Sequence, residues 1–317
     1  MKFQINRELF VEGLNKVAKV VSSKDVMPVL TGILVEVKED EIMLTGTNVT
    51  ETISHCIPVD GESVVVIESG KTVFPRQVVD IVKKLKKQVS FHFDGQGHTT
   101  IQSGKSTFQL NCLDAEEYPQ IPKVDMKNPT IVFEGIQFRD YVKRTAFAAS
   151  ENEARPILQG VLYDIIADEK LNLVCTDSHR LARIKHTVSN SVDARIVVPA
   201  KALDNAIKIF DLSREVHTFV NDSQLVFFRN GQKIYSTRLF EGNYPDTSRL
   251  IPGDYSSTMT INRKEFINAL ELIGGIANSA ENTTRGIAKL HVNGVASLSS
   301  YQAQTGKGEV QIPYESL

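Results

Sequence analysis

Asp177, Ser178 and His179 are the three residue types of a hydrolase catalytic triad, and they stand in consecutive positions. Consecutive side chains in a strand or turn point apart, so they cannot converge on one reacting atom as a triad requires. Two other interpretations stay open, because Arg180 and Leu181 follow directly. The segment is a polar binding surface at the end of an apolar strand, or a salt-bridged sheet edge. The sequence therefore predicts no catalytic residue here.

Two short segments resemble the end of a phosphate-binding loop, namely Gly70-Lys71-Thr72 and Gly104-Lys105-Ser106. Such a loop needs another glycine five residues earlier, so that backbone amides can wrap the phosphates. Val65 and Thr99 occupy those positions. We expect both segments to be turns.

Cysteine and histidine spacing gives no metal site. Cys56, Cys112 and Cys175 are far apart and form no CxxC pair, and the seven histidines show no HxxxH or HxH spacing. This usage is typical of buried thiols in a cytoplasmic protein. The sequence predicts no metal, no cofactor and, because no run of 18 apolar residues occurs, no membrane partner.

Basic residues gather in segments with helical periodicity. Lys83, Lys84, Lys86 and Lys87 lie on or near the polar face of a predicted helix after Pro75. Lys143 and Arg144, and then Lys201 and Lys208, lie in two later predicted helices. A net charge of −2 argues against uniform coating by nucleic acid but permits one basic face. No aromatic residues alternate with these cations, so we expect contact with a duplex backbone without base recognition.

The elements that position these residues recur along the chain. Phe10, Phe138 and Phe266 are spaced by 128 residues, each early in an amphipathic segment. Met27–Gly32 returns as Arg155–Gly160 at the same spacing. A period of this length is that of a whole domain rather than of a solenoid repeat. We therefore predict repeated domains at 1–122 (copy one), 129–250 (copy two) and 256–317 (copy three, partial).

Each copy combines two apolar helical stripes with several β-branched strands. In copy one, the stripes begin near Leu9 and after Pro75, and strands fill the intervening residues. Copy two has helices from about Phe138 to Ala149 and after Pro199; copy three has one from Arg263 to about Ile276. We predict an α+β fold of tandem modules, each with two helices packed on antiparallel sheets.

The sequence of copy three corresponds to about half of copy one, because Ile312-Pro313 matches Ile57-Pro58. We expect a chain whose third domain lacks its C-terminal half. A naturally short form, for example one carried on a mobile element, is the alternative.

Four segments occur in the order found in one protein family, together with the domain-length repeats. They are Thr45–Asn48, Arg155–Leu158, Thr176–Leu181 and Gly242–Asp246. The chain resembles the bacterial DNA sliding clamp, the beta subunit of DNA polymerase III. That resemblance implies modules arranged as an arc or ring. It implies a homodimeric ring that encircles duplex DNA and tethers the replicative polymerase. It implies a non-catalytic processivity factor, acting in the cytoplasm with the polymerase alpha subunit, the clamp loader and other clamp-binding proteins. The homodimer is expected if the third domain is complete.

The resemblance also assigns residues to three surfaces. Partner peptides would bind a pocket formed by Leu158, Thr176, Ser178, His179, Arg180, Leu181, Pro245, Arg249 and Leu250. Many family members have glycine where Ser178 stands, which would narrow the pocket. DNA would contact Lys24, Lys83, Lys84, Lys87, Lys143, Lys201 and Lys208. The dimer interface would use Phe108 on one side and Leu272, Ile273 and Ile276 on the other. An alternative hypothesis is a truncated, clamp-like adaptor that binds partner peptides without closing on DNA.

Overall fold

The computed structural model describes residues 1–122, 124–166, 170–187, 193–221, 225–277, 287–302 and 306–316. Contacts group the chain into two compact units, Met1–Tyr244 and Pro245–Leu317, and each is described by itself. The first unit holds copy one and nearly all of copy two. The boundary between these copies therefore remains a prediction from the repeat.

Copy one packs two helices, α1 (Arg7–Val17) and α2 (Val78–Lys83), against its strands. Asn6 caps α1, since its side-chain oxygen accepts a hydrogen bond from the Glu8 amide at 2.9 Å. Phe10, Leu14 and Val17 form the buried stripe of α1. The strands are β1 (Lys2–Asn6), β2 (Gly32–Val37), β3 (Glu41–Thr47), β4 (Glu51–Pro58), β5 (Val64–Glu68), β6 (Gly70–Pro75), β7 (Gln88–Phe93), β8 (His98–Ser103) and β9 (Ser106–Asn111). Short 3-10 turns lie at η1 (Pro28–Thr31) and η2 (Ala115–Glu117).

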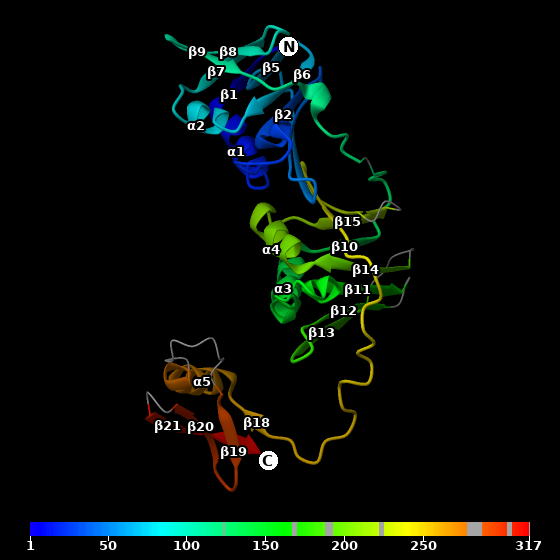
Figure 1. The fold of residues 1–317 in the computed structure, drawn as a ribbon, viewed down its shortest axis with the longest axis vertical. Helices are drawn as coiled ribbons and strands as arrows, with labels where there is room; N and C mark the ends of the chain where they lie inside the picture. The colour runs from blue at the N-terminus through cyan, green and yellow to red at the C-terminus, as the bar shows by residue number, and fades with distance from the viewer. Residues whose placement is uncertain are drawn as a thin grey trace. The chain divides into compact units, whose positions relative to one another are not determined.

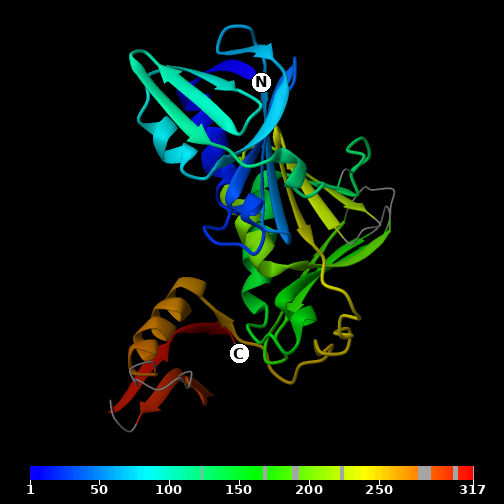
Figure 2. The same ribbon diagram turned by 45° about the horizontal axis from the view of Figure 1, so that its top comes forward.

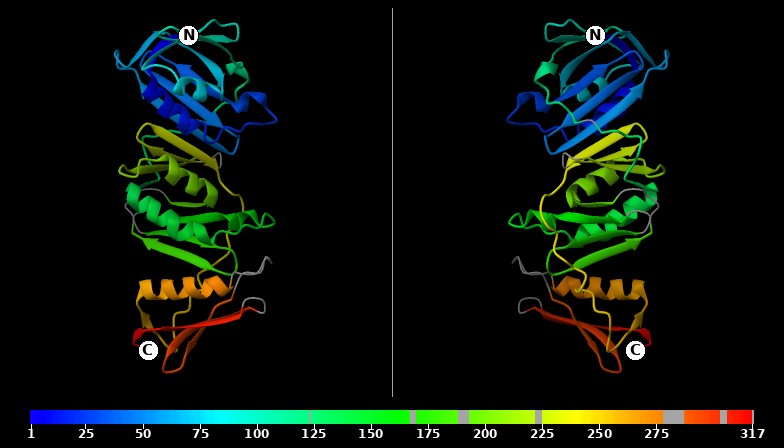
Figure 3. Two further views of the ribbon diagram at one scale, coloured as in Figure 1. Left: turned by 90° about the vertical axis from the view of Figure 1, so that its left-hand side faces the viewer. Right: turned by 90° about the vertical axis from the view of Figure 1, so that its right-hand side faces the viewer.

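Copy two repeats this plan with α3 (Gly135–Thr145) and α4 (Ala200–Ile209). Its strands are β10 (Ile131–Phe133), β11 (Gly160–Ile166), β12 (Lys170–Thr176), β13 (Leu181–His186), β14 (Ala194–Pro199), β15 (Val216–Asn221), β16 (Leu225–Asn230) and β17 (Lys233–Arg238). The 3-10 turns are η3 (Ala146–Ala148) and η4 (Pro156–Gln159). Within this unit the four helices lie along one side of the sheets (Figures 1 and 3).

The sheets of the two copies join through one pair of strands. Copy one contributes a five-stranded sheet, β5-β1-β7-β8-β9. Its other strands continue into copy two as an eight-stranded sheet, β10-β15-β16-β17-β4-β3-β2-β6. The joint is the antiparallel pair β4 and β17, in register from Lys233 opposite His55 to Thr237 opposite Glu51. Figure 2 shows β4 and β17 running side by side there. A smaller sheet, β13-β12-β11-β14, completes copy two.

Aromatic side chains fill the cores of both copies. Phe3 and Phe91 stack with ring centroids 4.8 Å apart, and the ring of Phe10 meets that of Phe91 edge-on at 5.0 Å. In copy two, the ring centroid of Phe138 lies 5.6 Å from that of Phe228 and 5.7 Å from that of Phe133. The repeated phenylalanines therefore hold the first helix of each copy onto its sheet.

The second unit contains α5 (Arg263–Ala277) and two small sheets. Its strands are β18 (Thr260–Ile261), β19 (Lys289–Val292), β20 (Ala296–Gln302), β21 (Gly306–Ile312) and β22 (Tyr314–Ser316). The apolar face of α5 packs on β20 and β21 through Ala269 and Ile273, against Leu298 and Ile312.

The lysine-rich helix of copy one is shorter than predicted. Helix α2 ends at Lys83, with Lys84 as its C-cap, so Lys86 and Lys87 lie beyond it. The chain must leave the helix here because β7 begins at Gln88 and the Lys87 carbonyl accepts a hydrogen bond from the Arg7 amide at 2.8 Å. The lysines stay exposed, but only Lys83 lies within the helix.

Two other local predictions change in part. The first helix of copy two begins at Gly135 and ends at Thr145, with a 3-10 turn to Ala148. The predicted turn at Gly70 is wrong, because Gly70–Thr72 begins β6 and pairs with β2. Gly104 has a φ of 61° in the β8–β9 turn, which confirms the other prediction.

Candidate functional site

The helix side of the first unit carries exposed cations. All seven predicted DNA-contacting residues are exposed: Lys24, Lys83, Lys84, Lys87, Lys143, Lys201 and Lys208. Lys143 lies on α3, and Lys201 and Lys208 lie on α4. These helices share one side of the unit (Figures 1 and 3), so their charges face the same solvent region. A surface of this kind suits phosphate contacts without base recognition.

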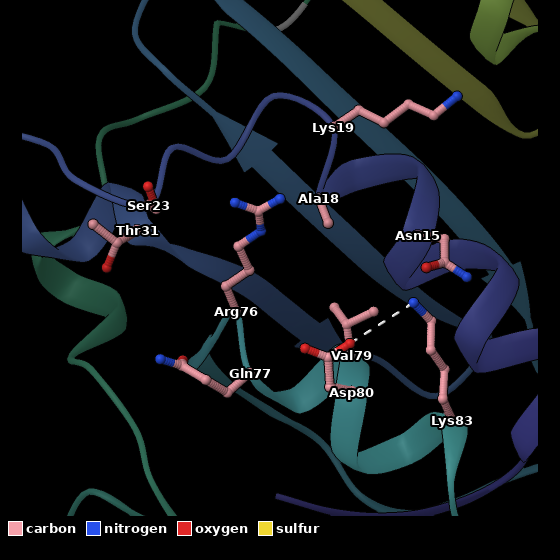
Figure 4. A pocket seen from close by; sticks show the side chains of 10 residues that line it. All are labelled: Asn15, Ala18, Lys19, Ser23, Thr31, Arg76, Gln77, Val79, Asp80 and Lys83. Carbon is pink, nitrogen blue, oxygen red and sulfur yellow. Dashed lines mark ion pairs between the residues drawn. The ribbon is translucent and has the colours of Figure 1, made fainter.

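A pocket between α1 and α2 adds two cations that the sequence analysis missed. Its volume is about 480 Å³, and its lining includes Lys19, Arg76 and Lys83 against a single carboxylate, Asp80. Figure 4 shows Arg76 rising into the pocket while Lys83 turns toward Asp80, with Nζ 3.9 Å from Oδ1. Arg76 directly follows Pro75, which marks the start of the predicted helix. That position was the signal by which it could have been found.

Lys19 also connects the two copies. Its Nζ donates a hydrogen bond to the Lys208 carbonyl at 3.1 Å, near the C-terminal end of α4. A cation at this end of a helix meets unpaired carbonyls and the negative end of the helix dipole. Lys19 therefore holds the end of α1 against α4.

The segment Thr176–Leu181 forms a tight turn between β12 and β13. The Thr176 hydroxyl donates to the Arg180 carbonyl at 2.7 Å, and the Ser178 amide donates to the same hydroxyl oxygen at 3.1 Å. Asp177 Oδ1 accepts from the amides of His179 and Arg180, both at 2.9 Å. Ser178 takes a left-handed φ of 77°, which explains why glycine suits this position.

This turn has no triad geometry. The Asp177 carboxylate binds backbone amides and the Arg180 guanidinium, at 3.0 Å from Nε, rather than orienting an imidazole. Burial alone would raise the pKa of Asp177, but the amides of Arg180 and His179 and the guanidinium lower it below its ordinary value. The salt-bridged edge and the polar surface thus occur together at one place.

An apolar cluster lies beside the turn. Leu158 and Val174 are buried with Tyr244, and Leu181 packs against them. The Thr176 amide donates to the Tyr244 hydroxyl at 3.0 Å. The Arg180 guanidinium lies 5.7 Å from the centre of the exposed Phe147 ring. The structure therefore brings six of the nine predicted pocket positions together: Leu158, Thr176, Ser178, His179, Arg180 and Leu181.

The other three positions, Pro245, Arg249 and Leu250, are exposed and belong to the second unit. Among the predicted interface residues, Phe108 on β9 and Leu272 on α5 are exposed by 42% and 66%. Ile273 is only 1% exposed and packs inside its own unit, so it forms core rather than surface. Ile276 lies over Gly308, since a Cβ at Gly308 would stand 2.4 Å from its Cδ1.

The described residues hold no cluster of His, Cys, Asp and Glu that could bind a metal ion. In the same part of the chain, no helix is both long and apolar enough to span a bilayer. Burial raises the pKa of Cys56 and of Cys175 to about 12 each, so both thiols stay protonated at neutral pH.

Family models match most of the chain. Residues 1–122 match the model described as DNA polymerase III beta subunit, N-terminal domain, and residues 133–246 match the central domain of the same subunit. A beta sliding clamp of Staphylococcus epidermidis is 37% identical over 314 residues, which cover 96% of this chain and 82% of that relative. One from Staphylococcus aureus matches to the same extent.

Solved structures agree with these sequence matches. The DNA polymerase beta subunit of Streptococcus pyogenes superposes with a TM-score of 0.92 at 29% identity, covering 100% of this chain and 84% of that one. The DNA polymerase sliding clamp of Bacillus subtilis superposes with a TM-score of 0.91 at 33% identity, with the same coverage.

Proposed function

We propose how this chain works from one premise: it belongs to the family of the bacterial DNA polymerase III beta subunit, the beta sliding clamp. Its function is that of a DNA polymerase processivity clamp in DNA replication. The finer parts of the proposal concern the duplex, the ring and the partner peptides. We place the protein in the cytoplasm and assign it no catalysis of its own.

The basic helix side carries the proposal that duplex DNA is the ligand. Cations from both copies lie on one side of the unit, and Arg76 and Lys19 extend that surface beyond the predicted lysines. They contact phosphates wherever the duplex stands, so the clamp can slide without recognising a base.

The internal repeat supports a homodimeric ring. Inside the first unit, β17 of copy two pairs with β4 of copy one. By sequence correspondence, β9 takes the place of β17 in copy one, and β21 takes the place of β4 in copy three. Strands β9 and β21 both lie at sheet edges. The same antiparallel pairing would join β9 of one chain to β21 of a second copy, with Phe108 and Leu272 at the contact.

Retention on DNA of different topology tests the ring. The protein is loaded onto a nicked circular plasmid with a clamp loader of a related bacterium, and its dissociation is followed by gel filtration. A topological link predicts long retention on the circle and rapid loss once the plasmid is cut to a linear form. Equal dissociation from both forms contradicts encirclement and favours the adaptor hypothesis.

The turn Thr176–Leu181 supports a pocket for partner peptides. It presents His179 and Arg180 to solvent beside the apolar cluster of Leu158 and Leu181. A linear peptide can insert an apolar side chain here while Arg180 hydrogen-bonds its backbone or carboxylates. The polymerase alpha subunit and the clamp loader are the proposed sources of such peptides.

Replacing His179 and Arg180 together by alanine should weaken a polymerase-derived peptide by about tenfold or more. Fluorescence anisotropy with a labelled peptide measures the change. Lys105→Ala, in the exposed β8–β9 turn, is the matched control and should leave affinity unchanged. Unaltered binding by the double variant would place the pocket elsewhere.

A further inference from the structure

The joint between the two copies holds a cavity of about 380 Å³ on the face of the sheet opposite the helices. Its floor includes Met43 of β3, Phe227 of β16 and Ile234 of β17. The sequence neighbours of these residues, such as Leu44, Phe228 and Tyr235, face the helix-side core. Because strand side chains alternate, the floor residues belong to the other face. Every wall of this cavity lies within the first unit.

The segment that connects the two copies forms one side of the cavity. Ile121, Pro122, Val124 and Met126 all line it. Three of these apolar residues, Pro122, Val124 and Met126, stand at alternate positions in the sequence. The surface therefore already accepts apolar side chains from a segment outside the sheet.

Few charges line the cavity. Glu36 and Lys38 are the charged residues in its lining, and the Lys38 Nζ lies 2.6 Å from Glu41 Oε1. Lys71, opposite Glu36 in the β2–β6 register, pairs with Glu116 at 2.9 Å. Most of the other lining residues are apolar or carry only a hydroxyl, so a ligand with uncharged, apolar side chains matches this lining.

The cavity lies where copy one repeats the architecture of the proposed peptide pocket. Thr47 Oγ1 donates to the Glu51 carbonyl at 3.0 Å, and the Val49 amide donates to Thr47 Oγ1 at 3.2 Å. Asn48 Oδ1 accepts from the amides of Thr50 and Glu51 at 3.1 and 2.8 Å. Val49 has a φ of 72°, close to the 77° of Ser178. This is the hydrogen-bond pattern of the turn at Thr176.

The correspondence extends to the residues beside the turn. Thr52, which follows the turn and lines the cavity, takes the place of Leu181, and Val124 takes the place of Leu250. A tyrosine hydroxyl lies beside each turn: that of Tyr118 donates to the Thr45 carbonyl at 3.2 Å, and that of Tyr244 accepts from the Thr176 amide at 3.0 Å. In copy one the opposing wall, Phe227 and Ile234, comes from copy two.

We propose that this cavity, the joint cavity, is a second binding site for linear partner peptides. Its ligand is an uncharged extended segment with apolar side chains at alternate positions, one of which enters between Met43 and Ile234. The inference rests on the proposed peptide-binding function, but it concerns residues separate from those of copy two. One ring would then offer two peptide sites on each chain.

The composition of the chain gives two clean probes. It contains no tryptophan, so all tryptophan fluorescence in the mixture comes from the peptide. It contains five methionines, of which Met43 and Met126 line the joint cavity. The probe is acetyl-Gly-Leu-Ser-Trp-Ser-Leu-amide, and its control has serine in place of both leucines and the tryptophan. Binding is followed by tryptophan anisotropy and by methyl resonances of labelled methionine.

The proposal predicts shifts at Met43 and Met126, with Met27 and Met259 unmoved, and no shift with the serine peptide. Met43→Lys should weaken the peptide by about tenfold or more, because it removes apolar contact with the entering side chain and places a charged side chain in the cavity. Val132→Lys, a similar change on the exposed edge strand β10, should leave affinity unchanged. Met126→Glu, outside the sheet, tests the same point should Met43→Lys disturb folding.

Unmoved resonances at Met43 and Met126, or full affinity in both Met43→Lys and Met126→Glu, would overturn the proposal. The Arg180→Ala variant separates it from the pocket of copy two. If the Arg180→Ala variant still binds the probe peptide, the joint cavity is supported. If Arg180→Ala loses the probe while Met43→Lys binds it with full affinity, the probe binds the pocket of copy two alone. The Met43 test uses the probe peptide and methionine resonances. Its result therefore stands even if the polymerase peptide does not bind the pocket of copy two.

Discussion

Val49 is held in a backbone conformation that its side chain disfavours. Its φ is 72°, and left-handed geometry is least suited to a β-branched residue. The turn hydrogen bonds impose this conformation, and the Arg238 Nε donates to the Val49 carbonyl at 3.4 Å across the joint. We predict that Val49→Asn stabilises the protein, because asparagine tolerates this region and can keep every backbone bond.

The magnitude follows from two terms, the strain that is relieved and the apolar contact that is lost. A left-handed residue costs roughly 1–2 kcal/mol, which asparagine largely avoids. The valine side chain is 52% exposed. Its removal therefore loses about half of the free energy gained by burying a valine, roughly 0.8 kcal/mol. The expected net gain is about 0.5–1 kcal/mol, or a rise of roughly 1–2 °C in Tm. Val49→Gly relieves the same strain, but glycine gives the unfolded chain more conformational entropy, which costs roughly 0.5–1 kcal/mol of stability. The stability of Val49→Gly should therefore be close to that of the wild type.

Thermal and urea unfolding, followed by circular dichroism, measure these differences. Val132→Asn is the matched control: Val132 is 41% exposed in the regular strand β10, so it loses the same kind of contact without relief of strain. It should be less stable than wild type. If Val49→Asn is destabilised as much as Val132→Asn, the turn at Val49 stores no strain and the reasoning is wrong.

Three further predictions concern charge and packing. His55 is buried beside Lys16 and Lys233, and burial lowers its pKa to about 4 from an ordinary 6.5, so the unfolded chain takes the proton first on acidification. The contribution of His55 to stability should fall by about 3 kcal/mol between pH 6.5 and 4 and change little below, and urea unfolding of His55→Gln should lose that part of the pH dependence. Lys201→Glu with Lys208→Glu should weaken duplex binding and reduce the slope of log K against log salt by about 1.8, measured by anisotropy at several salt concentrations; an unchanged slope contradicts a phosphate contact. Gly135→Ala should destabilise by about 1–3 kcal/mol in urea, because its Cβ would stand 2.3 Å from the Arg214 carbonyl oxygen, and wild-type stability would contradict that close packing.

Periodicity predicted the parts of the fold that depend on local sequence. The stripe containing Phe10 and Leu14 does form a buried helix face, and the repeat predicts the helices after Gly135 and Arg263. The end of α2 was not predictable in this way. Lysines are good helix formers, and long-range bonds end the helix early: the Arg7 amide and side chain donate to the Lys87 and Leu85 carbonyls, and the Lys86 amide donates to Ser103 Oγ.

The candidate site was predicted in its composition more than in its arrangement. The segment Thr176–Leu181 shows its turn chemistry in the residue types alone, since threonine and aspartate commonly bond nearby amides. Ile273 shows the limit of pattern alone, because any apolar helix residue can face its own core or a partner. Arg76 was missed because a single arginine outside a basic run carries no periodic signal.

The joint between β4 and β17 gives the first unit a direction-dependent stiffness. Antiparallel backbone bonds lie perpendicular to the strands, and here they cross from one copy to the other over Glu51–His55. A load that slides the copies past each other along the strands would strain all these bonds together. A load across the strands would open them one after another from the end. The joint therefore resists shear far better than peeling, and a tether pulling on the protein would find it stiff in one direction and compliant in the other.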